Sequence, residues 1–102
     1  YVPSDYGKLI DALIAKNAQG WAFNRYIRGS VSGVNIGATP AGRPAMINAR
    51  YRFSQLGQPN NGSVRVTFEN GRPACLYFFD APRTCRIPSP GVVTAYEKGE
   101  FR

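Results

Sequence analysis

The chain has 102 residues, of which 43% are hydrophobic and 13% aromatic, a composition typical of one packed domain that excludes a predominantly disordered protein. No apolar stretch is long enough to cross a bilayer, because LIDALIA is interrupted by Asp11 and followed by Lys16. The 13 basic and 6 acidic residues give a formal net charge of +7. This charge favours anionic partners such as nucleic acid, lipid headgroups, envelope polymers or an acidic protein surface, although many small soluble proteins are basic without such a partner.

A helix is predicted at the start of the chain, over about residues 4–19. Its apolar residues recur at spacings of three and four and so form one stripe with the period of an α-helix. The stripe consists of Tyr6, Leu9, Ile10, Leu13 and Ile14. The following segment, 21–27, either extends the helix as far as residue 27 or begins an extended region. We expect helix with a break near Gly20, because glycine commonly follows a helix end.

Beyond Gly29 the apolar residues recur at every second position, which indicates strands. The glycine-rich segment 31–37 is expected to be a first strand. Segments 46–54 and 63–69 are expected to be half-buried strands, each with one apolar and one polar face. The apolar faces of these two strands consist of Ile47, Ala49, Tyr51, Phe53, Val64, Val66 and Phe68.

The dipeptide Asn-Gly at positions 70 and 71 predicts a type I′ turn that leads into a strand over residues 72–79. In a hairpin with this two-residue turn, Val66 lies opposite Cys75. Cys75 then faces inward with Val66, because opposed residues of neighbouring strands point to the same side of a sheet. Alternation along the strand places Phe78, and likewise residue 76, on the outer face.

The two cysteines, Cys75 and Cys85, are expected to face each other, because a second turn centred on Asp80 brings them to opposed positions of a hairpin. Their spacing excludes a C-x-x-C redox motif, and the chain has no histidine to complete a zinc site or to activate a thiol. Two interpretations remain, a cross-strand disulfide and a pair of unreactive buried thiols, and we favour the disulfide.

A disulfide in a small domain indicates an oxidising compartment, so the expected location is the periplasm or the outside of the cell. The given sequence begins at Tyr1 without a methionine. This beginning is compatible with the removal of a signal peptide, which export requires, and equally with a trimmed sequence.

The predicted fold class is α+β, in a single domain over residues 1–102. An N-terminal helix packs on an antiparallel sheet of four to five strands, the last of them at residues 84–87 or 92–96. In general shape this order of a helix and then a meander resembles cystatin-like folds, a likeness of topology alone. The expected core consists of Leu9, Leu13, Ile14, Ile36, Tyr51, Phe53, Val66 and Phe68.

The sequence contains no motif that indicates catalysis. The acidic residues are scattered over helix, turn and tail positions, and no spacing suggests that two of them meet as an acid and a base. Motifs for a serine nucleophile or for a phosphate-binding loop are also missing. We therefore expect a protein that is not an enzyme and that holds no cofactor and no metal.

The outer face of the predicted sheet is the candidate binding surface. It is expected to gather four arginines, Arg50, Arg52, Arg65 and Arg72, with the aromatic ring of Phe78. Arginines and aromatic side chains concentrate the binding energy at many protein interfaces. A face that is merely solvated, or that is covered by residues 85–102, is the alternative without a binding role.

We expect a small secreted or periplasmic binding domain, such as an inhibitor, an immunity-type protein or an accessory protein of an envelope assembly. It would dock an acidic protein partner through the arginine-rich face or through the loops at 39–44 and 55–62. The alternative function is a cytosolic nucleic-acid-binding module that uses the same face, because arginines interleaved with aromatic rings bind phosphates and bases. The sequence does not indicate an oligomeric state.

Overall fold

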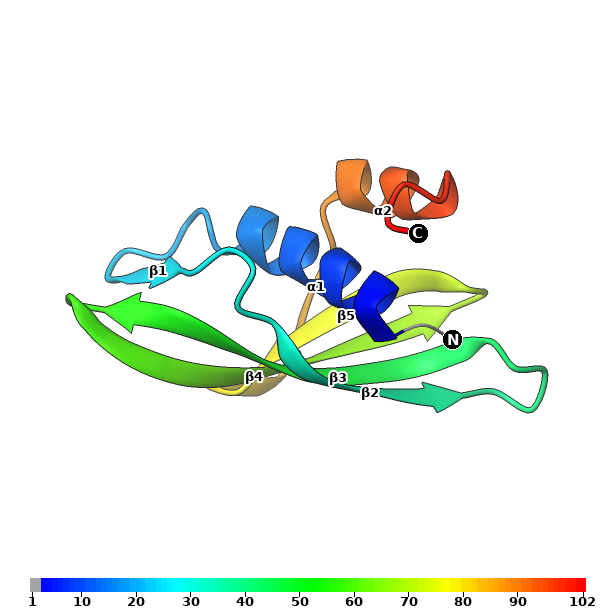
Figure 1. Ribbon diagram of the computed structural model, residues 1–102, viewed down its shortest axis with the longest axis horizontal. Helices are drawn as coiled ribbons and strands as arrows, with labels where there is room; N and C mark the ends of the chain where they lie inside the picture. The colour runs from blue at the N-terminus through cyan, green and yellow to red at the C-terminus, as the bar shows by residue number, and fades with distance from the viewer. Residues whose placement is uncertain (1–2) are drawn as a thin grey trace.

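The computed structural model describes the backbone of residues 3–102 and the side chains of residues 6–102. Helix α1 (Pro3–Asn17) precedes one antiparallel sheet, and helix α2 (Pro90–Glu97) follows it (Figure 1). The strands are β1 (Asn24–Tyr26), β2 (Ser32–Ala38), β3 (Pro44–Gln55), β4 (Gln58–Glu69), β5 (Arg72–Phe78) and β6 (Ala81–Arg86). This arrangement confirms the predicted α+β class with an N-terminal helix on an antiparallel sheet. Neither helix is long and apolar enough to span a membrane, among the residues described.

The strand order is β1-β3-β4-β5-β6, and β2 pairs with β3 on the same edge as β1. The long β3–β4 hairpin forms the centre of the sheet, with β1 beside the last residues of β3 and β2 beside its first half. Both helices lie on one side of the curled sheet, as Figure 1 shows. The sheet therefore has an inner face, which α1 and α2 cover, and an outer face on the opposite side.

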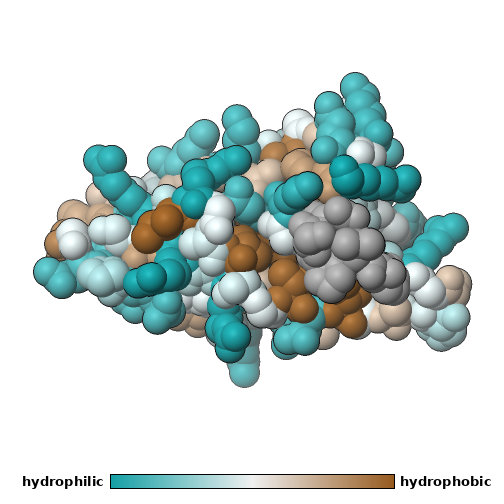
Figure 2. All heavy atoms as spheres, viewed as in Figure 1, coloured by the Kyte–Doolittle hydropathy of each residue, from teal (hydrophilic) through white to brown (hydrophobic). Residues whose placement is uncertain are grey.

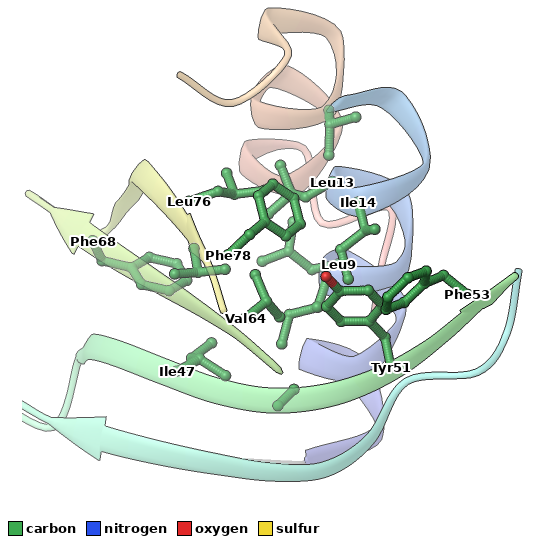
Figure 3. Packing of buried hydrophobic residues seen from close by; sticks show 14 residues of the cluster. Leu9, Leu13, Ile14, Ile47, Tyr51, Phe53, Val64, Phe68, Leu76 and Phe78 are labelled. Atoms are coloured by element: carbon green, nitrogen blue, oxygen red, sulfur yellow. The ribbon is translucent and has the colours of Figure 1, made fainter. Parts of the chain in front are cut away.

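The core lies between α1 and the inner face. The apolar stripe of α1 meets the alternating apolar residues of β3, β4 and β5, because the helical period of 3.6 and the strand period of two each place these residues on one side (Figure 3). The predicted core residues are buried, except Ile36, which is partly buried and packs against the cluster. The core also includes Ile10, Ile47, Ala49, Val64, Leu76, Phe78 and Val92.

The expected continuation of the helix to residue 27 is wrong, because the chain turns after Asn17 and residues 24–26 form β1. The amide of Trp21 donates to the carbonyl of Ala18, which closes this turn. The indole of Trp21 then lies against the rings of Tyr51 and Phe78, at centroid distances of 6.4 and 5.4 Å. Packing of this one large ring into the core outweighs the weak helical pattern of residues 21–27.

Of the two alternatives for the last strand, the segment 84–87 overlaps β6, and the segment 92–96 is part of α2. Pro90 is at the start of this helix, where its fixed φ and its missing N–H are tolerated. Val92 is buried in the core, and Tyr96, one helical turn later, packs on Phe68 at 5.9 Å. The i, i+4 spacing of these two apolar residues is the helical signal that the strand interpretation missed.

The turn at Asn70-Gly71 is confirmed, with φ of 52° and 75°, but the register that follows it differs by one residue from the prediction. Phe68 pairs with Pro73, whereas Thr67 pairs with Cys75, so that Ala74 is an extra residue in β5. Proline has no N–H to donate to the ladder, and such residues are accommodated at β-bulges. Beyond the bulge every side chain of β5 points to the side opposite to the one predicted.

The bulge turns Cys75 and Tyr77 outward and places Leu76 and Phe78 in the core, where Phe78 is 1% exposed. The prediction of an outer position for these two apolar residues is therefore wrong. The disulfide between Cys75 and Cys85 is confirmed, with the two Cα atoms 5.1 Å apart. It joins β5 to β6 at the solvent side, where Cys85 is exposed.

Replacing both cysteines by alanine is expected to lower the free energy of unfolding by about 2–3 kcal/mol, because the bond closes a short loop of the unfolded chain. The fold should persist, since the bond lies outside the core. Urea unfolding monitored by Trp21 fluorescence measures the change. Reductant should destabilise the parent to the same extent and should leave the double variant unaffected. An equal response of both proteins to reductant would contradict this prediction.

Two neighbouring tyrosines should respond oppositely to the loss of their hydroxyl groups. The Tyr26 hydroxyl donates to the carboxylate of Asp11, whereas the buried Tyr51 hydroxyl has no hydrogen-bond partner among the described residues. We expect Tyr26→Phe to lose about 1.5–3 kcal/mol of stability, since the acceptor is charged. Tyr51→Phe is expected to be neutral or stabilising, because it removes an unsatisfied buried group. Urea unfolding at neutral pH measures both changes.

The same pair predicts a loss of stability at alkaline pH. Burial raises the pKa of both phenols above the usual 10.0, and the hydrogen bond to Asp11 adds to this rise for Tyr26. Above about pH 10 the unfolded chain therefore releases protons that the folded chain keeps, and the free energy of unfolding falls. The decline should be shallower in Tyr51→Phe than in the parent. Parallel pH profiles for the two proteins would rule out this contribution from Tyr51.

Candidate functional site

The outer face of the sheet remains uncovered in the described chain. The C-terminal segment, which was one candidate to cover it, packs through α2 against α1 and β5 on the inner side. Hydrophilic side chains project from the lower side of the molecule in the view of Figure 2, where Figure 1 places the outer face. The central part of the face consists of Asn48, Arg50, Arg52, Arg65, Thr67 and Tyr77, and we call this set the basic face.

Three of the predicted arginines come together on the basic face. Arg50 and Arg52 alternate along β3, and Arg65 lies on the neighbouring strand β4, directly opposite Asn48. The Arg65 Nε donates a hydrogen bond of 3.1 Å to the Asn48 Oδ1, which orients the guanidinium along the sheet. Arg65 is flanked on its other side by the ring of Tyr77. The strands thus present a continuous polar row of amide, guanidinium and phenol groups.

Arg50 extends over the backbone of β2. A Cβ atom built on Gly33 would lie only 2.9 Å from the Arg50 Nη2, so the guanidinium occupies the space that a side chain at position 33 would need. Gly33 has a φ of 62° at an irregularity in the β2–β3 pairing, a conformation that glycine adopts without strain. The glycine of the predicted first strand therefore leaves the space that the Arg50 side chain occupies.

The arginines of the basic face form no ion pair with an acidic side chain of residues 6–102. Two ion pairs occur among the side chains of residues 6–102, between Arg28 and Asp11 and between Arg72 and Glu97. The guanidinium groups of Arg50, Arg52 and Arg65 are exposed and lack a carboxylate within ion-pair distance in this part of the chain. Their charge is available to an anion from outside, in the bidentate geometry that arginine offers to carboxylates and phosphates.

Two predicted members do not belong to the basic face. Arg72 pairs with Glu97 of α2 at 3.1 Å and so lies at the edge next to the helices. Phe78 is part of the core, with the guanidinium of Arg86 5.3 Å from its ring centroid. The aromatic side chain that the outer face does present is Tyr77, which the predicted register had turned inward.

A shallow hollow lies beside Tyr77 on the outer face. It has a volume of about 430 Å³, and its wall combines polar and apolar groups. Its lining includes Met46, Asn48, Arg65, Tyr77, Phe79 and Pro82. Such a mixture suits the docking of a side chain from a protein partner. A group of three or more potential metal ligands is not found in the described part of the chain.

Sequence reasoning missed Arg25, because residues 21–27 were expected to be helical. In the structure Arg25 pairs with Ser54 of β3, and the amide of Ile27 donates a hydrogen bond to the carbonyl of Arg52. Opposed residues share a side of the sheet, so Arg25 extends the basic face toward the end of the β3–β4 hairpin. The alternation of Asn24, Arg25 and Tyr26 was the available signal, although three residues are too few to identify a strand.

The turn between β3 and β4 carries a backbone strain that the sequence did not suggest. Leu56 has a φ of 51° and is followed by Gly57 at 83°. The left-handed conformation costs a residue with a Cβ about 1–2 kcal/mol, and asparagine tolerates it better than leucine. The tight turn between β4 and β5 has Asn70 at the corresponding position with a φ of 52°.

Comparisons with protein-family models, with curated proteins and with solved structures find no match to this chain.

Proposed function

We propose that this chain is a non-enzymatic binding domain that docks an acidic protein partner through the basic face. The observation that carries the proposal is an open sheet face on which three arginines lack acidic partners among the described residues. Placing like charges together on a folded surface is unfavourable, and an acidic partner relieves this repulsion. An inhibitor, an immunity-type protein or an accessory protein of an envelope assembly would act in this way.

The composition of the basic face supports a protein partner more than a nucleic acid. Sheet-based binders of single strands stack successive bases on several exposed aromatic rings. The basic face offers one such ring, Tyr77, next to a hollow whose lining mixes polar and apolar residues, Phe79 among them. A phenol beside arginines and a methionine is a combination enriched at protein interfaces.

The disulfide supports export to the periplasm or beyond the cell. Disulfides persist in oxidising compartments and are reduced in most cytosols. The bond between Cys75 and Cys85 is exposed on the Cys85 side, so a cytosolic reductant would reach it. A disulfide also supplies a larger share of the total folding stability in a domain of this size than in a larger domain.

Charge reversal of the basic face tests the proposed function. A variant with Arg50→Glu, Arg52→Glu and Arg65→Glu should bind a labelled polyglutamate peptide at least about a hundredfold more weakly than the parent at low salt. A control variant with Lys8→Glu, Lys98→Glu and Arg102→Glu changes the net charge equally at exposed positions on or next to the helices. Fluorescence anisotropy measures both affinities, and circular dichroism verifies that each variant is folded.

The proposal requires that only the basic-face variant loses affinity for the polyglutamate peptide. Equal losses in both variants would mean that net charge alone attracts the peptide, and the basic face would then have no special role. A labelled single-stranded oligonucleotide provides the second comparison. Tighter binding of the oligonucleotide than of the peptide, with a steep decline as salt rises, would overturn the protein partner in favour of a nucleic acid.

A further inference from the structure

One end of the molecule presents two large apolar side chains to solvent. Phe23 and Leu56 are 71% and 75% exposed, and the Leu56 amide donates a 3.1 Å hydrogen bond to the Phe23 carbonyl. We call these two residues the apolar tip. They lie where β1 and the turn of the β3–β4 hairpin come together, at the left end of the longest axis in Figure 1. In Figure 2, tan and brown atoms at this end adjoin teal, hydrophilic ones.

The exposed position of Leu56 adds little to the stability of the folded chain. Leu56 occupies a left-handed conformation that asparagine or glycine would adopt with less strain, as Asn70 does in the β4–β5 hairpin. Its side chain also remains mostly exposed, so burial within the chain does not offset the strain. A strained backbone that displays an apolar side chain points to a contact with something outside the chain.

Two arginines lie beside the apolar tip, one of them without an acidic partner among the described side chains. A hollow of about 720 Å³ adjoins it, and its wall includes Trp21, Arg25 and Arg28 together with Phe23 and Leu56. Arg25 has no carboxylate within ion-pair distance among the described side chains, and Arg28 faces Asp11 at 3.4 Å with two thirds of its own side chain exposed. Among the side chains of residues 6–102, none that lines the hollow is acidic. The surroundings of the tip therefore attract an anionic and partly apolar surface.

We propose that the apolar tip inserts into the interface of an anionic lipid bilayer, while Arg25 and Arg28 bind the headgroup phosphates. The tip is a convex turn at the end of a molecule that extends 43 Å along its longest axis and 26 Å across. A projecting turn needs no matching cavity in a fluid bilayer, whereas a protein partner would need a pocket shaped for it. Apolar side chains flanked by basic ones are the usual composition of elements that bind membrane interfaces.

This contact lies at the end of the sheet, where Arg25 extends the basic face, and does not involve Arg50 or Arg65. The basic face docks a partner along the middle of the sheet, and the tip anchors the domain at one end. Membrane attachment of this kind is reversible, because two apolar side chains and a few charges give weak binding by comparison with a spanning helix. An exported domain attached in this way would present its basic face to partners at the membrane surface.

Vesicle binding tests the proposal. The parent should sediment with vesicles of equal parts phosphatidylcholine and phosphatidylglycerol and should bind pure phosphatidylcholine far more weakly. The variant Phe23→Ser with Leu56→Asn should bind the anionic vesicles at least about tenfold more weakly, because it removes the apolar contribution. It should also be folded, since Leu56→Asn relieves the left-handed strain of the turn. Ile87→Ser, at a residue that is 72% exposed in another part of the chain, is the matched control and should bind as the parent does.

Trp21 provides a direct reporter, because it is the single tryptophan of the chain and lines the hollow beside the tip. Brominated lipids should quench its fluorescence in the parent and in the Ile87→Ser control, and much less in the tip variant.

Unchanged binding and quenching in the tip variant would overturn the proposal, as would a failure of the parent to bind anionic vesicles. Polyglutamate binding by the tip variant should equal that of the parent, which separates this result from a failure of the basic face. A loss of polyglutamate binding in the tip variant, without vesicle binding by the parent, would identify the tip as a protein contact instead.

Discussion

One extra residue, Ala74, decides which side of the sheet each residue of β5 faces. The bulge lies between the pairs Phe68–Pro73 and Thr67–Cys75, just after the Asn-Gly turn. Because side chains alternate along a strand, a shift of one position exchanges the buried and exposed sets. The shift brings Leu76 and Phe78 to the core, sends Tyr77 to the basic face, and moves the disulfide to the solvent side. The composition of the core, the side on which the disulfide lies and the aromatic ring of the basic face all depend on this shift.

The aromatic cluster around Tyr51 connects the two ends of the sheet. The Tyr51 ring lies over Gly62, so that a Cβ atom at Gly62 would be 2.5 Å from the ring. Trp21 packs on the same ring, and Tyr26 contacts it while binding Asp11 of α1. This packing holds β1 against β3 although only three residues of β1 pair. The position of Arg25, and of the apolar tip beyond it, follows from contacts in the core.

The elements with strong local signals were predictable from the sequence. The stripe of α1, the alternation of residues 46–54 and 63–69, and the turn at Asn70-Gly71 appear where they were expected, because each rests on periodicity or turn chemistry within a few residues. The expected loop at 55–62 is wrong, because β4 already begins at Gln58 and only two residues form the turn. The position of Arg50, Arg52 and Arg65 on the outer face followed from the same alternation. The core of the sheet was therefore predictable on its two longest strands.

The remaining features depend on contacts that are distant in the sequence. The bulge follows from the meeting of Pro73 with a partner strand, β1 from the packing of Trp21, and α2 from the contact of Val92 and Tyr96 with the core. The pairing of Arg72 with Glu97 likewise required α2 to be in place. Short segments carry too little periodic information to reveal such preferences by themselves.

Both borders of the sheet are poor templates for the addition of a further strand. The pairing of β2 with β3 is irregular at two places, between Ser32 and Asn35 and between Gly37 and Ala38. At the opposite border, β6 contains Pro82, which lacks an N–H, and its pairing with β5 is irregular as well. Irregular, proline-containing borders of this kind protect β proteins from amyloid-like stacking and from fusion into continuous sheets. The irregular pairing of β2 and β6 therefore disfavours the edge-to-edge addition of a further strand at these two positions.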